Sequence, residues 1–420
     1  MRSVLRKWLA NLGVAGLLAP SGVCLAQAEG VAPEYWEAYG SAELEATLFA
    51  EAPQFAGQDR NDVSFAIEPT FFAEWADGDV SLTVTPFARV DEADDQRTYM
   101  DLREAKVDLI KGDFEVTIGA DTVFWGKTEA NHLVDIINQT DAVESLDDEA
   151  SLGQPMIRVA MLNDLGEFSA YYLPYVRLRT FAGVNGRLRT GLPVNNARAE
   201  VRAAGDRFAP SFAFRFDGVF GDADIGLSAF HGVSRDPSFI ATDFVNVGGN
   251  LVPTGLAPIY DQITQLGFDG QYTAGPTLYK IEVIARDGQR NLNGVEEEFI
   301  AATGGLEYTL YGLFDNADLG LIGEYGWDSR GDNATSIFQN DVILGARLAL
   351  NDEDDTSVLI TSAIDHVHGS ASLRAEAQTR LADGWIAEVE GVLFLNQADE
   401  PLGADLQDDS FMKMKLTYYW

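Results

Sequence analysis

The chain has 420 residues, of which 66 are acidic and 29 are basic, and its formal net charge is −37 at pH 7. Such an excess of carboxylates argues against nucleic acid as a partner, because phosphate binding needs concentrated Lys and Arg. Hydrophobic residues make up 46% and aromatic residues 11% of the chain, which is far too much for a disordered polypeptide. Composition therefore predicts a folded protein.

The first 28 residues have the pattern of a secretory signal peptide. Three basic residues within the first seven are followed by an apolar stretch over residues 9–18 and a small-x-small cleavage site at residues 26–28. The apolar stretch is too short for a transmembrane helix, which needs about 20 residues. Cleavage after Ala28 removes the only cysteine, Cys24, so we expect an exported chain without an intramolecular disulfide and with one domain over residues 29–420.

From residue 36 onward, apolar and polar residues alternate with a period of two, which is the pattern of β-strands with two unlike faces. In a membrane barrel the apolar face meets lipid and the polar face lines the lumen. We count about eighteen such segments, near residues 36–50, 62–75, 79–91, 98–111, 113–121, 155–163, 166–175, 210–219, 224–234, 260–273, 276–287, 298–311, 316–327, 338–350, 356–366, 370–381, 384–395 and 409–420.

The links between these segments are mostly short after even strands and longer after most odd strands. Short turns on one side and long loops on the other are typical of outer-membrane barrels. The link at 366–369 is short although it falls on the long-loop side, so sixteen strands is the alternative count. Pro69 and Pro86 lie inside strand patterns, and we expect local bulges there because a closed barrel has no edge strand.

The third long link, residues 122–154, is rich in Phe, Trp, Leu and Ile and would be poorly solvated outside the cell. We expect it to fold back into the lumen and narrow it. The alternative is a lid that packs on other external loops. The candidate constriction residues in this link are Phe124, Trp125, Lys127, Glu129, Asp135, Asn138 and Asp141.

The next long link is basic, with seven of the 29 basic residues within about 31 positions. Facing the acidic stretch 135–149 across an eyelet, these arginines would create a transverse field of the kind that sets selectivity in pores. The alternative is that they bind lipopolysaccharide phosphates or pair with the acidic loops. The basic eyelet candidates are Arg177, Arg179, Arg187 and Arg189.

Strand parity predicts charged side chains of both signs in the lumen, most of them as members of salt-bridge networks. The candidates are Arg89, Arg215, Arg286, Arg347, Arg374, Glu282 and Glu307.

The chain ends in an alternating segment, residues 411–420, whose last residue is the aromatic Trp420. This segment resembles the closing strand of bacterial outer-membrane barrels, which the assembly machinery reads. An ordinary last strand of a soluble sandwich would explain the alternation but not the terminal Trp.

One motif resembles a known family. Phe-Trp-Gly-Lys at 124–127, followed by Asp-Ile-Ile-Asn-x-x-Asp at 135–141, is similar to the characteristic loop of an uncharacterised family of proteobacterial porin-like barrels, distantly similar to alginate-export porins. The resemblance covers residues 122–175. It implies an outer-membrane channel with no cofactor, and it implies no particular substrate.

We therefore expect an all-β, antiparallel transmembrane barrel in the outer membrane of a Gram-negative bacterium. The expected function is porin-like passive diffusion of small polar or charged solutes. The alternatives are a substrate-specific facilitator for hydrophobic or carboxylated compounds, a structural or adhesive barrel, and a soluble β-rich periplasmic protein. The four scattered histidines give no metal-ligand or catalytic set, so we expect no enzyme. Expected partners are membrane lipid, lipopolysaccharide, the barrel-assembly machinery and, by analogy with other porins, two further copies in a homotrimer.

Overall fold

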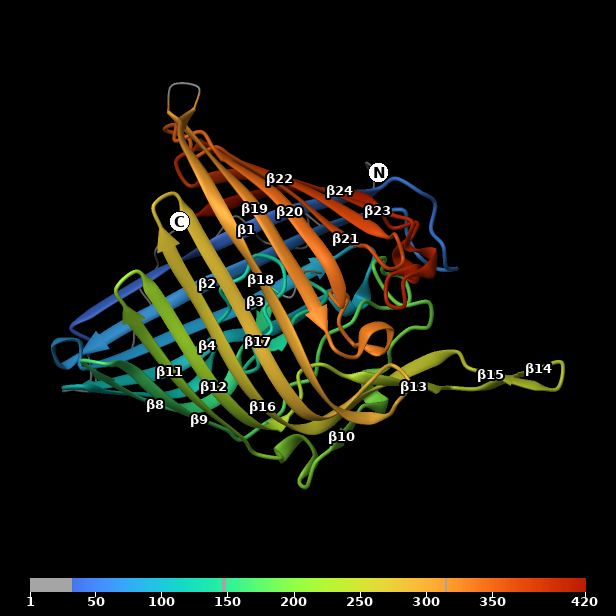
Figure 1. Cartoon of the computed structure of the whole chain (residues 1–420), viewed down its shortest axis with the longest axis horizontal. Helices are drawn as coiled ribbons and strands as arrows, with labels where there is room; N and C mark the ends of the chain where they lie inside the picture. Colours follow the sequence, from blue (N-terminus) through green and yellow to red (C-terminus); the bar gives the residue numbers. More distant parts are fainter. Residues whose placement is uncertain (1–31, 146–148, 314–315) are drawn as a thin grey trace.

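The computed structural model describes residues 32–145, 149–313 and 316–420, so the predicted signal peptide, residues 1–28, lies outside the described residues. Eighteen antiparallel strands form one closed barrel (Figure 1). They are β1 (Tyr35–Phe49), β2 (Asn61–Trp75), β3 (Val80–Asp91), β4 (Tyr99–Lys111), β5 (Phe114–Asp121), β8 (Gln154–Asn163), β9 (Gly166–Leu173), β11 (Ser211–Phe220), β12 (Ala223–Val233), β16 (Gly255–Ala274), β17 (Thr277–Arg290), β18 (Glu296–Leu313), β19 (Ala317–Asp328), β20 (Asn340–Ala349), β21 (Ser357–Asp365), β22 (Ala371–Ala382), β23 (Trp385–Leu395) and β24 (Phe411–Tyr419).

The barrel closes where the last strand meets the first. β24 pairs with β1 from Ser41↔Tyr419 to Phe49↔Phe411, and the backbone of Trp420 exchanges two further hydrogen bonds with Gly40. β21 and β22, which flank the short link at 366–369, pair with each other along their length. The prediction of eighteen strands is confirmed, and the alternative of sixteen is wrong because both strands beside that link are present.

The two ends of the barrel differ. Short turns join the strands at the end where the C-terminus lies, on the left of Figure 1, and the long loops lie at the opposite end. Five of these loops matter below: L3 (122–153), L4 (174–210), L5 (234–254), L8 (366–370) and L9 (396–410). Short strands lie within them, namely β6 (Gln139–Thr140) and β7 (Ser151–Leu152) in L3, β10 (Glu200–Arg202) in L4, and β13 (Ser238–Thr242), β14 (Val245–Val247) and β15 (Asn250–Val252) in L5.

The barrel is apolar outside and polar inside, the reverse of a soluble protein. Leu266 and Leu344 on the outer face are 60% and 52% exposed, whereas Glu282 and Thr303 on the inner face are 0% exposed. Exposing so much apolar surface to water is unfavourable, whereas contact of the same surface with lipid is not. The outer face is therefore that expected of a barrel set in a bilayer.

The two strand prolines lie opposite one another in neighbouring strands. The β2–β3 ladder runs to Ile67↔Ala88, is interrupted, and resumes at Phe71↔Val84 in the same register, which aligns Pro69 with Pro86. The β3–β4 ladder shifts register at Pro86. The expected bulge is thus present at Pro86. The bulge expected at Pro69 is wrong, since both ladders of β2 keep their register there, and the β2–β3 ladder is only interrupted because neither proline has an N–H to donate.

Helical structure among the described residues is restricted to three-residue 3-10 turns: η2 (Ala76–Gly78), η3 (Asp95–Arg97), η4 (Asn196–Arg198), η5 (Asp206–Phe208), η6 (Gly331–Asn333), η7 (Gln397–Asp399) and η8 (Ala404–Leu406). In the described part of the chain, no helix has the length and apolar character needed to cross a membrane.

Candidate functional site

L3 enters the lumen and is fixed to the opposite wall by hydrogen bonds. The buried carboxylate of Glu282 on β17 accepts from the backbone N–H of Lys127 (2.6 Å), Thr128 (3.0 Å) and Val134 (3.2 Å) and from the Thr128 hydroxyl (2.9 Å). Glu324 on β19 accepts from the Glu129 N–H at 2.8 Å. The backbone N–H groups of L3 have no strand partner inside the lumen. Carboxylates of the barrel wall accept their hydrogen bonds instead.

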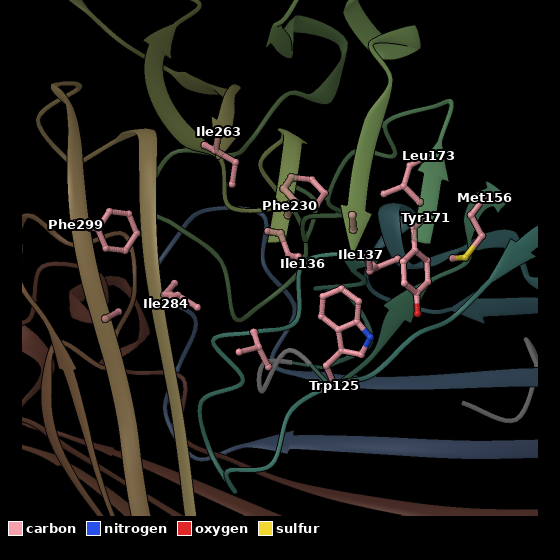
Figure 2. Close-up of a cluster of buried hydrophobic side chains, with 13 residues drawn as sticks. Trp125, Ile136, Ile137, Met156, Tyr171, Leu173, Phe230, Ile263, Ile284 and Phe299 are labelled. Atoms are coloured by element: carbon pink, nitrogen blue, oxygen red, sulfur yellow. The ribbon is translucent and has the colours of Figure 1, made fainter. Parts of the chain in front are cut away.

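An apolar core holds the same loop against the inner wall. The ring of Trp125 meets that of Tyr171 at 5.7 Å between centroids, and Ile136 and Ile137 are about 1% exposed (Figure 2). The wall contributes inward-facing apolar residues, which in this region replace the usual polar lining: Met156, Tyr171, Leu173, Ala213, Phe230, Ile263, Ile284, Phe299 and Ala301. Burial of large side chains stabilises such packing by about 1.5–3 kcal/mol each, so L3 is a packed part of the barrel. The expected lumen-folded loop is confirmed, and the lid alternative is wrong.

The two halves of the L3 motif bind each other. Asp135 Oδ1 accepts from the backbone N–H of Trp125 (2.6 Å) and Gly126 (3.2 Å), and Asn138 Oδ1 accepts from the Val123 N–H (2.8 Å). A Cβ on Gly126 would lie 2.7 Å from His132 Nδ1, so any larger residue there would displace the His132 ring. Asp and Asn at these spacings thus close the Phe-Trp-Gly-Lys segment into a compact turn.

The end of L3 is fixed to strands on the other side of the barrel. Asp141, which is fully buried, accepts from Arg103 on β4 (2.6 Å) and from the Thr180 hydroxyl (2.6 Å). Glu144 pairs with Arg89 on β3 at 2.7 Å. L3 therefore spans the lumen from β17 and β19 to β3 and β4.

Two cavities lie on either side of L3. The outer cavity, toward the long loops, has a volume of about 630 Å³, and the inner cavity, toward the short turns, has about 1010 Å³. They have eleven lining residues in common, which we call the shared ring. L3 contributes Val123, Phe124, Glu144, Ser145, Glu149 and Ser151, and β21–β24 contribute Leu359, Arg374, Glu376, Glu390 and Lys413.

The strand side of the shared ring carries a cross-strand network of charges. Glu390 pairs with Arg374 at 2.9 Å and with Lys413 at 3.0 Å, and Arg374 also contacts Glu376 at 2.5 Å. These side chains are 13–35% exposed, so they are both paired and in contact with the cavities. Each pair in so wet a site contributes at most about 1 kcal/mol to stability.

The predicted L3 residues fall into three groups. Phe124 belongs to the shared ring, is 62% exposed, and meets His132 edge to face at 4.9 Å. Glu129 lines the outer cavity and pairs with Arg347 and, at 3.6 Å, with Lys280. The side chains of Trp125, Asp135, Asn138 and Asp141 hold the loop in its conformation by the contacts described above. Lys127 contributes through its backbone N–H, from which Glu282 accepts a hydrogen bond.

The four L4 arginines have partners in several parts of the described chain, and an eyelet between them and residues 135–149 stays a prediction. Arg177 pairs with Asp101 at 2.8 Å, Arg179 bonds Thr140 Oγ1 at 3.1 Å, and Arg187 pairs with Asp409 of L9 at 2.6 Å. Arg189 bonds backbone carbonyls of L4 itself. These contacts hold the L4 arginines within the packed loops, although Arg187 Nη1 and Arg189 Nε are buried without a hydrogen-bond partner among the described residues. Arg179 and Arg187 also line the outer cavity, where a role toward solutes stays a prediction.

The seven predicted lumen charges all point inward, and each has a partner. Arg89 and Glu282 hold L3, Arg347 reaches Glu129, and Arg374 lies in the shared ring. The remaining pairs lie on the wall: Arg215 with Asp217 and Asp269, Arg286 with Asp236 at 2.6 Å, and Glu307 with Lys280 at 3.9 Å.

Sequence reasoning missed several residues of the site. Glu144 and Leu359 line the shared ring, and Arg235 of L5 lies in the outer cavity beside Asp236. Burial lowers the pKa of the Arg235 guanidinium to about 10, so it still carries its charge at neutral pH. The acidic character of 135–149 pointed to the neighbourhood of Glu144, but no local pattern distinguishes Leu359 or Arg235 from wall and loop residues of the same types.

The strands and the loop together define a closed, 18-stranded antiparallel barrel with a loop folded into its lumen. Crystal structures of two Pseudomonas aeruginosa proteins are similar. OccK11 (OpdR) matches with a TM-score of 0.52 and 10% sequence identity, and the match covers 91% of this chain and 95% of that chain. OccK8 (OprE) matches with a TM-score of 0.50 and 11% sequence identity, and the match covers 92% of this chain and 98% of that chain. A substituted form of the Rh. blastica porin matches with a TM-score of 0.44, 10% identity and coverage of 92% and 100%. No family model and no curated protein matches the sequence. The likeness to the first two shows a shared fold.

Proposed function

We propose that this protein is an outer-membrane channel through which small polar or charged solutes diffuse passively, narrowed at the shared ring. The observation that carries the proposal is that cavities on the two sides of L3 have eleven lining residues in common. A barrel of this strand number is wide enough to leave an aqueous lumen. The apolar core of L3 packs on β8–β18, and the shared ring lies between L3 and β21–β24. The apolar outer face and the porin-type fold support the membrane location.

The lining charges favour cations. The outer cavity is lined by 12 acidic and 8 basic residues and the inner cavity by 7 acidic and 6 basic residues. A lumen with a net negative lining raises the local concentration of cations and lowers that of anions. We therefore infer a modest cation preference.

Planar-bilayer recording tests both points. Purified protein that shows heat-modifiable gel migration should give open steps, and a KCl gradient should give a reversal potential of the cation-selective sign. The double variant Glu376→Gln/Glu390→Gln should move that potential toward zero. Glu115→Gln is the matched control, because Glu115 on β5 points inward beside Arg158 but lines neither cavity. Folded protein without open steps contradicts the channel proposal.

One observation favours a second candidate, a facilitator specific for a hydrophobic or carboxylated compound. The aromatic side chain of Phe124 is exposed and belongs to the shared ring, which also includes Val123 and Leu359. The proposed constriction therefore has an apolar side as well as a charged one. This candidate predicts low conductance together with saturable uptake that disappears when the gene is deleted. A structural or adhesive barrel predicts neither conductance nor an uptake defect.

The remaining expectations about the cell belong to the same proposal. Export by the signal peptide, residence in a Gram-negative bacterium, membership of the porin-like family suggested by the L3 motif, and distant similarity to alginate-export porins all fit an outer-membrane channel. Recognition of β24 and Trp420 by the assembly machinery, contact with lipopolysaccharide and a homotrimer fit it as well. Cross-linking in native outer membranes would test the trimer.

A further inference from the structure

Three side chains with metal-binding atoms meet at the long-loop end of the barrel. They are Asp365 at the end of β21, His368 in L8 and Glu400 in L9. One ligand atom from each lies within 4.8 Å of the others. His368 Nδ1 is 2.6 Å from Asp365 Oδ2 and 3.9 Å from Glu400 Oε2.

The cluster has more buried negative charge than its neighbours balance. Asp365 and Glu400 are 2% and 5% exposed, and the buried Asp341 lies opposite Asp365 in the β20–β21 ladder. In the part of the chain that the structure describes, the only ion-pair partner of Asp365 and Glu400 is His368. A protonated His368 imidazole would balance the charge of only one of these three carboxylates. Burying unpaired carboxylates is costly, so a proton or an additional cation stabilises the site.

A second feature points to a ligand at this place. Glu400 Oε2 accepts from the Ser370 hydroxyl at 3.0 Å, but Glu400 Oε1 is buried and has no hydrogen-bond partner among the described residues. Buried carboxylate oxygens are normally satisfied, since each unsatisfied polar group costs about 1–3 kcal/mol. A metal ion coordinated by Glu400 would satisfy it.

We propose that Asp365, His368 and Glu400 form a binding site for a divalent transition-metal ion of the Zn²⁺ type. An imidazole nitrogen with two carboxylates suits Zn²⁺, whereas Ca²⁺ and Mg²⁺ prefer oxygen ligands alone. Zn²⁺ binds N and O atoms at about 2.0–2.2 Å, which places two ligand atoms of a tetrahedral site about 3.4 Å apart, so the three atoms need only small side-chain movements. His368 Nε2 lies 3.6 Å from Asp332 Oδ1, a carboxylate able to orient the ring from its far side.

The consequence is a link between two loops at the outer mouth. L9 provides Glu400, and its Leu402 and Leu406 line the outer cavity. The carboxylates of Asp405 and Asp409 in L9 accept backbone N–H groups of L4. A metal ion at the cluster would therefore fix L8, L9 and L4 as one unit over the cavity.

The test measures Zn²⁺ binding to tag-free, folded protein in detergent after removal of metal with EDTA and dialysis. Wild type should bind one Zn²⁺ per chain by calorimetry, and Co²⁺ should give an absorption band typical of an imidazole-ligated ion. His368→Ala and Glu400→Gln should each weaken Zn²⁺ binding at least tenfold. His366→Ala should bind as wild type, because His366 is exposed, stacks on Tyr325 and lies outside the cluster.

Several results would overturn the proposal. These are absence of stoichiometric Zn²⁺ binding by the wild type, unchanged binding in both cluster variants, loss of binding in His366→Ala, and binding of Ca²⁺ with none of Zn²⁺. Heat-modifiable migration confirms that each variant is folded. If His368→Ala fails that control, Glu400→Gln, which keeps the shape of the side chain, carries the test. Metal binding is measured without conductance, so its outcome is independent of the proposed channel.

Discussion

Replacing Glu282 with alanine should release L3 from the wall while leaving the barrel intact. Glu282 accepts four hydrogen bonds from L3, three of them from backbone N–H groups. It lies on the inner face of β17, so its removal does not change the outer apolar surface or any ladder between strands.

The magnitude follows from the groups left behind. In Glu282→Ala the N–H groups of the buried Thr128 and Val134 and of the partly buried Lys127 lose their acceptor. At the lower figure of about 1 kcal/mol for each unsatisfied buried donor, the docked loop loses about 3 kcal/mol relative to the released one. Each 1.4 kcal/mol is a factor of ten, so the released population rises about 100-fold.

Trypsin reports on this equilibrium directly. Lys127 is the only Lys or Arg in the sequence of L3. Trypsin would cut the Lys127–Thr128 bond, and Glu282 holds the N–H groups of both residues. When opening is fast relative to cleavage, the cleavage rate follows the open population. We expect cleavage after Lys127 about 100-fold faster than in wild type.

Glu307→Ala is the matched control, since it also removes an inward glutamate but one whose ion pair is a 3.9 Å contact with Lys280. It should change the cleavage rate by less than a factor of five, in line with a pair worth about 1 kcal/mol or less. Equal cleavage of Glu282→Ala and wild type would refute the reasoning. So would an equal increase in both variants, because that would mean general loosening of the lumen.

Four further results are expected. Trp125→Ala removes a buried ring at a cost of about 3–5 kcal/mol to L3 docking and should raise single-channel conductance; unchanged conductance contradicts this. Arg374→Gln leaves Glu376 and Glu390 without that guanidinium and should make the reversal potential more cation-selective, so a shift toward anions speaks against the assigned lining. Asp409→Asn strips Arg187 of its buried partner at about 3–5 kcal/mol and should speed protease cleavage of L4 without altering gel migration of the barrel; equal cleavage rates argue against the link. Deleting Trp420 removes two backbone hydrogen bonds at the seam and should lower the yield of folded barrel, and an unchanged yield counts against its role.

Strand positions could be predicted from the sequence because the membrane imposes a strict rule on them. Residues facing lipid must be apolar, and the next residue along the strand faces the other way, so each segment carries its own assignment. All eighteen predicted segments correspond to barrel strands, with ends that differ by a few residues except at β16, which extends to Gly255. L3 was also predictable, since Trp125, Ile136 and Ile137 need a dry site and the lumen wall provides one.

Contacts between distant loops could not be predicted in this way. Arg187 and Asp409 are 222 residues apart, and charge alone favoured the nearer acidic stretch of L3 as the partner of the L4 arginines. Two acidic residues of that stretch pair with wall arginines, Asp141 with Arg103 and Glu144 with Arg89. The proposed metal cluster was missed for the same reason, because Glu400 comes from a different loop than His368 and spacing rules detect only local ligand sets.

The apolar core beneath L3 has a consequence for the order in which the barrel assembles. All of its members lie between Trp125 and Ala301, and none comes from β1 or β24. The middle of the chain can therefore pack its loop against a curved, still open sheet, before the first and last strands meet. Early docking would shield those side chains from water during insertion and spare the loop from threading into a finished pore. We expect the seam at Gly40 and Trp420 to be the last part of the molecule to form.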